Sequence, residues 1–68
     1  MICATDASYN SIYKIACIGF SIDGNIKTKI INNIKGCTQA EIMAIDFLFE
    51  ELNILNPIEN IKIYYVIL

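Results

Sequence analysis

The sequence predicts one α/β domain, in which a three-stranded antiparallel meander is followed by a helix and by a last strand parallel to the first. Three observations support this fold class. Residues 38–55 are the only long segment with helical periodicity. Shorter apolar segments separated by turn residues precede it, and residues 61–68 form a nearly continuous apolar run typical of a buried strand. A strand–helix–strand crossover then places the last strand parallel to the first.

Composition limits the classes of function. The 68 residues are 56% hydrophobic and 18% charged, which fits a single folded domain. A net charge of -2 argues against a general polyanion binder, because such binding depends on lysine and arginine. The start of the chain does not have the pattern of a signal peptide, and no apolar run is as long as a membrane span, so we expect a cytoplasmic protein without a membrane partner. Three cysteines without any histidine exclude a zinc knuckle and a Cys/His nucleophile pair.

The first strand is expected at residues 2–5, so that Asp6 lies at its carboxyl end. The sequence Ala-Ser-Tyr-Asn-Ser follows, and these residue types favour a turn. An aspartate in this place has two possible roles. It can be a simple turn residue whose carboxylate accepts hydrogen bonds from the amides of Ser8 or Tyr9, or it can belong to a functional site.

The next two strands are expected at residues 12–22 and 26–32, joined by an Asp-Gly-Asn turn. Both faces of the first of these are largely apolar, so it should be central or covered on both sides. In the second, Lys27 and Lys29 share one face, as expected of an exposed edge strand. The two faces of the strand at residues 12–22 carry Ile12, Ala16, Ile18, Phe20 and Ile22 on one side and Tyr13, Ile15, Cys17 and Gly19 on the other.

The helix at residues 38–55 carries a carboxylate in an unexpected position. Glu41 begins the apolar stripe that should face the sheet, where an ionised carboxylate is costly to bury unless it is paired, hydrogen-bonded or bound to a cation. Thr38-x-x-Glu41 is also a capping box, in which Glu41 would be satisfied locally. The two roles do not exclude each other. The rest of the stripe consists of Ala44, Ile45, Leu48, Leu52 and Leu55.

The last strand is expected at residues 61–68, after an Asn-Pro pair that ends the helix. Its composition predicts burial on both faces, so Tyr64 and Tyr65 should pack in the interior rather than stack on bases. If this strand lies beside the first, Asp6 is at the edge where open α/β sheets place their sites. Whether Glu41 joins it depends on how the helix docks.

Four short motifs follow one another along the chain. They are Asp-Ala-Ser at residues 6–8, a hairpin through Asp-Gly at 23–24, Thr-Gln-Ala-Glu-Ile-Met-Ala at 38–44, and a buried strand after the helix. In this order and spacing they resemble the amino-terminal half of a ribonuclease H domain, over nearly the whole chain. The resemblance implies a truncated ribonuclease H-like fold, with residues 1–68 as a single partial domain.

The resemblance also implies a function, the metal-dependent endonucleolytic hydrolysis of RNA in RNA/DNA hybrids. Asp6 and Glu41 match two carboxylates of the family that are catalytic and bind two Mg²⁺ or Mn²⁺ ions. Two hard cations held by carboxylates activate a water and stabilise the leaving oxygen of a phosphodiester. The family's third and fourth carboxylates would lie beyond residue 68, so we expect these residues alone to bind metal weakly and not to cleave.

Two alternatives remain at this point. One is a catalytically inactive small α/β interaction module, whose exposed sheet face is covered by a second copy, by a partner chain or by a missing carboxyl-terminal half. The other is a nucleotide-binding protein, since Asp6-Ala7-Ser8 before a hairpin looks a little like the first phosphate loop of actin-like sugar kinases and ATPases. That loop favours glycines where this chain has Ala7 and Tyr9.

Overall fold

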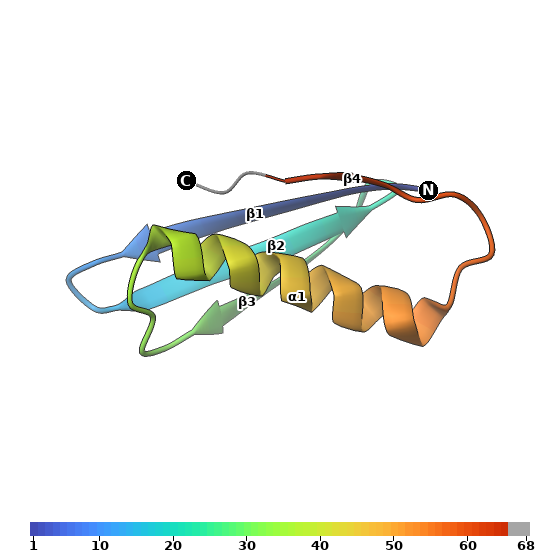
Figure 1. Ribbon diagram of the computed structural model, residues 1–68. Helices are drawn as coiled ribbons and strands as arrows, with labels where there is room; N and C mark the ends of the chain where they lie inside the picture. The colour runs from blue at the N-terminus through green and yellow to red at the C-terminus, as the bar shows by residue number, and fades with distance from the viewer. Residues whose placement is uncertain (66–68) are drawn as a thin grey trace.

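The computed structural model describes residues 1–65 as a four-stranded mixed sheet with one helix across one of its faces (Figure 1). The strand order is β3-β2-β1-β4, in which β1 pairs antiparallel with β2 and parallel with β4, and β2 pairs antiparallel with β3. The predicted α/β class and the order of elements are therefore confirmed. The elements are β1 (Ile2–Asn10), β2 (Ile15–Ile22), β3 (Asn25–Ile31), α1 (Cys37–Leu55) and β4 (Lys62–Tyr64).

β1 is longer than predicted, and the turn expected directly after Asp6 is wrong. Residues 7–10 continue the strand and pair with β2, up to Asn10 opposite Ile15. The Tyr9 hydroxyl donates a hydrogen bond to the Ile34 carbonyl at 3.0 Å, which ties this end of β1 to the loop before α1. Asp6 therefore lies in the middle of β1 and not at its carboxyl end. Because residues 6–8 are a strand segment, they do not form the loop that the phosphate-binding alternative needs.

The β1–β2 turn lies at residues 11–14 instead. The Asn10 side-chain carbonyl accepts hydrogen bonds from the amides of Ile12 and Tyr13, at 3.0 and 3.1 Å, and Lys14 has a positive φ of 54°. An asparagine that bonds forward to nearby amides is a usual way to begin a turn. This turn removes Ile12 and Tyr13 from β2, and both side chains are exposed.

β2 is central, as predicted, and its alternating apolar side chains point toward the helix. Ala16, Ile18, Phe20 and Ile22 are all buried. The sequence also allowed the other face of β2 to be covered. Among the described residues, no element lies over that face. The sheet is therefore covered by a helix on one side only within residues 1–65.

β3 is the predicted edge strand, and its two lysines lie on the face that carries the helix. The Lys27 ammonium forms an ion pair with Glu51 of α1 at 2.7 Å. The Lys29 ammonium lies 4.4 Å from the ring centroid of Phe47. Aliphatic lysine stems cover apolar surface while their charged ends stay in water, so both side chains close the core at this edge.

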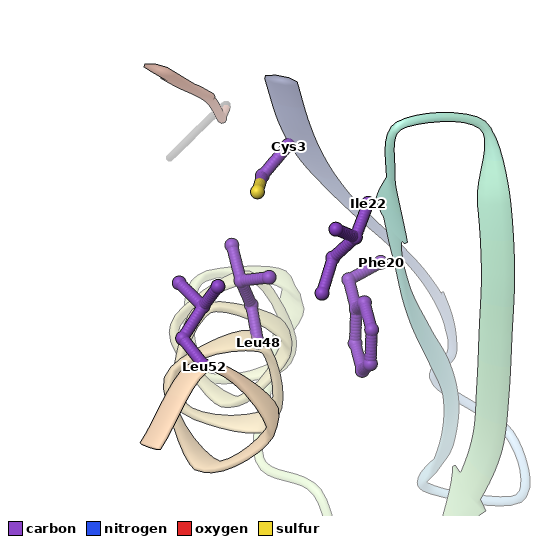
Figure 2. Close-up of a cluster of buried hydrophobic side chains, with 5 residues drawn as sticks. All are labelled: Cys3, Phe20, Ile22, Leu48 and Leu52. Carbon is purple, nitrogen blue, oxygen red and sulfur yellow. The ribbon is translucent and has the colours of Figure 1, made fainter. Parts of the chain in front are cut away.

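The core is the layer between α1 and the sheet. Figure 2 shows Leu48 and Leu52 of α1 directed toward Cys3, Phe20 and Ile22 of the strands, and Leu48 has no exposed surface. A second cluster lies nearer the start of the helix and joins the first through the partly buried Phe47. It consists of Ala16, Ile18, Ile34, Ala40 and Ala44.

The helix does not begin with the predicted capping box. Its cap residue is Gly36, so Thr38 is the second helical residue and cannot act as the cap. The Gln39 side chain instead accepts a hydrogen bond from the Lys35 amide at 2.7 Å, which holds the preceding loop. At the other end Asn56 adopts a left-handed conformation and its amide bonds to the Leu52 carbonyl, an ordinary helix termination.

The prediction that the last strand is buried on both faces is wrong for its described part. Ile61, Tyr64 and Tyr65 are 40%, 53% and 58% exposed. The reason is that β4 lies at the sheet edge and pairs only with residues 2–4 of β1. The remainder of this predicted strand, residues 66–68, lies outside the described residues. Over residues 1–65 the structure has no helix with the length and apolar character needed to cross a membrane.

The position of Leu48 gives the first testable prediction. Leu48→Ala should lower the free energy of unfolding by about 2–5 kcal/mol, because it leaves a cavity in the only core layer described. Ile54→Ala is the matched control, since Ile54 is on the same helix but 79% exposed. Urea unfolding followed by circular dichroism measures both. Equal losses in the two variants would contradict this description of the core.

Candidate functional site

Glu41 is the buried carboxylate among residues 1–65. Its side chain is only 6% exposed, and its Oε2 has no hydrogen-bond partner among the described residues. Burial raises the pKa of Glu41, and the negative charge of Asp6 raises it further. Both effects disfavour the ionised form, which would need a cation or a hydrogen-bond donor to compensate. The sequence-based expectation that Glu41 faces the sheet is therefore confirmed.

Asp6 belongs to the opposite face of the sheet, where it is exposed and lies opposite Gly19 of β2. Its Oδ1 accepts a hydrogen bond from the Ala7 amide at 2.9 Å. This local bond resembles the turn interaction considered from the sequence, but it involves the next residue and not Ser8 or Tyr9.

The bond to Ala7 shows where the Asp6 carboxylate points. Along a strand, the N–H and C=O groups of alternate residues point to opposite neighbours. The Met1 carbonyl accepts a hydrogen bond from the Lys62 amide, so residues in phase with Met1, including Ala7, point their main-chain groups to the β4 side. Asp6 Oδ1 is therefore turned toward the edge of β1 that pairs with β4 over residues 2–4.

Glu41 and Asp6 thus approach one edge of β1 from two layers, the helix and the sheet. They are close enough for the charge of Asp6 to raise the pKa of Glu41. Two carboxylates that repel each other in this way suit a hard divalent cation, because Mg²⁺ and Mn²⁺ prefer oxygen ligands. Residues 1–65 contain no group of three or more side chains that could hold a metal ion.

Next to this edge, the open face of the sheet carries a groove of about 340 Å³. Its floor includes Asp6, Gly19 and Thr28, which form one row across β1, β2 and β3. A Cβ atom on Gly19 would lie 3.0 Å from Thr28 Cγ2 and 3.1 Å from the Lys27 carbonyl oxygen. Gly19 therefore keeps the groove open beside Asp6.

Thr5 is the residue of this site that sequence reasoning missed. It is 9% exposed, and its Oγ1 is, with Glu41 Oε2, one of the two buried side-chain polar atoms that have no hydrogen-bond partner among the described residues. The signal was present in the alternation of β1, where a hydroxyl occupies the apolar phase between Cys3 and Ala7. It was hidden by the prediction that the strand ends at residue 5.

Comparison of the chain with protein-family models, with curated proteins and with solved structures gave no match. The resemblance to ribonuclease H therefore stays a prediction from the sequence motifs named above.

Glu41 gives the second prediction, which concerns pH. Below about pH 4.3 the carboxyl is protonated in both the folded and the unfolded chain, so its ionisation costs nothing. As the pH rises, Glu41 ionises first in the unfolded chain, because burial raises its pKa in the folded chain. The free energy of unfolding therefore falls until the pH passes the pKa of Glu41 in the folded chain. In the presence of a chelator, Glu41→Gln should therefore be more stable than the unsubstituted chain at pH 8, by about 1–3 kcal/mol, and show no such advantage at pH 4.

Glu50→Gln is the matched control for this experiment, because Glu50 is exposed on the same helix. Chemical unfolding at pH 4, 6 and 8 measures the three proteins. Parallel pH profiles for the unsubstituted chain and Glu41→Gln would show that Glu41 is not held in a costly environment.

Proposed function

We propose that this chain forms the amino-terminal part of a ribonuclease H-like domain, whose function is metal-dependent endonucleolytic hydrolysis of RNA in RNA/DNA hybrids. The observation that carries the proposal is the buried carboxylate oxygen of Glu41, which has no partner among residues 1–65 and whose pKa the charge of Asp6 raises further. The order of strands and the helix across β1 and β2 are consistent with the fold that the resemblance implies. Three free thiols among residues 1–65 fit a reducing compartment, and we propose the cytoplasm.

In this function Asp6 and Glu41 are catalytic residues that hold Mg²⁺ or Mn²⁺. The ions supply activation of a water and stabilisation of the leaving oxygen at a phosphodiester. The chain contributes two carboxylates in different settings. Asp6 is exposed and accessible to a nucleic acid, whereas Glu41 is buried, where its attraction for a cation is less screened by water. Further ligands would come from other carboxylates of the complete domain.

The third prediction tests hydrolysis, with the protein encoded by the whole reading frame that contains these residues. It should cleave the RNA strand of an RNA/DNA hybrid only with Mg²⁺ or Mn²⁺, and Asp6→Asn or Glu41→Gln should reduce the rate by at least about 100-fold, since each removes a metal ligand. Asp46→Asn, on the exposed face of α1, should retain the rate. Cleavage that survives Asp6→Asn, or that is absent in the unsubstituted protein, would refute the proposal.

A second candidate is the catalytically inactive interaction module, favoured by the apolar side chains on the open face of the sheet. Ile2, Ile26, Ile30 and Tyr64 lie there with more than half of their surface exposed. Isolated apolar residues are normal on surfaces, but a sheet face with several of them suits a second copy or another chain.

Sedimentation equilibrium provides the fourth prediction, which applies to this candidate. If the open face is an interface between copies, residues 1–68 should form a dimer that Ile30→Lys dissociates, because the substitution places a charge in the buried contact. Ile58→Lys should have no effect, since Ile58 is fully exposed in the loop before β4. A compact monomer at all concentrations would count against the module.

A further inference from the structure

The two buried polar atoms that have no partner among residues 1–65, Thr5 Oγ1 and Glu41 Oε2, lie in the same layer. Thr5 has the phase of Cys3 and Ala7 in β1. Cys3 packs in the cluster with Leu48, and Ala7 packs against the cluster at the start of the helix. The Thr5 side chain must therefore point between these clusters, at the face of α1.

Glu41 approaches this place from the helix. It precedes Ile45 and Leu48 on the α1 flank that lies over β1, because Phe47 and Glu51 on the other flank contact β2 and β3. The carboxylate also senses the charge of Asp6, the chain neighbour of Thr5. The hydroxyl and the carboxylate are therefore both directed into the layer between β1 and α1.

Their chemistry is complementary. An ionised carboxylate only accepts hydrogen bonds, whereas a threonine hydroxyl donates one and can rotate its hydrogen to suit. Each group costs free energy if it stays buried and unpaired, and one water that accepts from the hydroxyl and donates to the carboxylate removes both costs. A hydroxyl in any other phase of β1 would point to the open face and could not reach Glu41.

The other described side chains of the strands packed on α1 do not offer this donor. On β1, Asp6 is an acceptor, the Cys3 thiol packs with Leu48, and the Tyr9 hydroxyl is bonded to the Ile34 carbonyl. The face of β2 that packs on α1 carries no titratable side chain. The lysines of β3 on this side are engaged with Glu51 and with the ring of Phe47.

We propose that Thr5 is a positioning residue, whose hydroxyl is linked to Glu41 Oε2 through one hydrogen-bonded water and fixes the carboxylate for a divalent cation. The second half of this inference rests on the proposed function, in which Glu41 is a metal ligand. The hydrogen bond itself does not. Outer partners that orient a ligand in this way commonly change metal affinity by about 10–100-fold when they are removed.

The direction in which one substitution changes the urea midpoint tests the hydrogen bond. Thr5→Val has the same shape without the hydroxyl. If the hydroxyl is bonded to Glu41, Thr5→Val should lower the urea midpoint at pH 8 in a chelator, because it leaves the carboxylate without a donor, and Thr5→Ser should keep the donor and restore most of the loss. If the hydroxyl is merely buried and unpaired, Thr5→Val should raise the midpoint.

The Glu41→Met background supplies the control. Methionine cannot accept a comparable bond, so there Thr5→Val should leave the midpoint unchanged or raise it. Thr28→Val, the same change at an exposed threonine of β3, should have equal small effects in both backgrounds. A Thr5→Val effect of the same sign and size in the unsubstituted and the Glu41→Met backgrounds, or one that Thr5→Ser does not reverse, would overturn the hydrogen bond.

Mn²⁺ alone is the probe for the positioning role. Its affinity is measured by calorimetry, with the same substitutions made in the protein encoded by the whole reading frame. Thr5→Val should weaken Mn²⁺ binding about tenfold and Thr5→Ser much less. Unchanged affinity in Thr5→Val would overturn the positioning role even if the hydrogen bond is present. If the unsubstituted protein of the whole reading frame binds no Mn²⁺, the proposed function and the positioning role both fail, and the urea midpoints still decide the hydrogen bond.

Discussion

The contact of one helix with one face of the sheet holds this chain together, and the other features depend on it. The buried side chains among residues 1–65 lie in or around this single layer, from Cys3 of β1 to Leu52 of α1. A domain of this size has little apolar area to offset chain entropy. The same layer also buries Glu41, whose ionised form is costly there. The layer that stabilises the fold therefore also contains the residue of the candidate site that destabilises it.

The buried carboxylate of Glu41 therefore lowers the stability of the chain unless another group compensates its charge. Small domains have only about 5–15 kcal/mol of stability, so an uncompensated group that costs about 1–3 kcal/mol is a substantial fraction. An apolar residue at position 41 would extend the stripe of α1 without that cost. The placement of Glu41 makes physical sense if a donor such as Thr5, a cation, or both offset its charge.

Much of the fold could be predicted because periodicity reports burial directly, as the alternation of Ala16, Ile18 and Phe20 did for the face of β2 under the helix. The errors arose where a segment's setting depends on its neighbours. Residues 7–10 have turn-forming side chains, but pairing with β2 keeps them extended. The last strand has the composition of a buried one, yet β4 has only β1 beside it among the described residues. Sequence pattern states what a segment can bury, not what is present to cover it.

The candidate site shows the same division. Glu41 could be recognised from the sequence as a carboxylate in an apolar stripe, and the structure buries it. Its relation to Asp6 could not be predicted, because it depends on the helix docking across β1 and on Asp6 Oδ1 turning to the β4 side through the Ala7 amide. These two contacts come from different layers, so any shift of α1 along the sheet changes the separation of the carboxylates. The packing of Leu48 that stabilises the chain therefore also sets the separation of the two carboxylates.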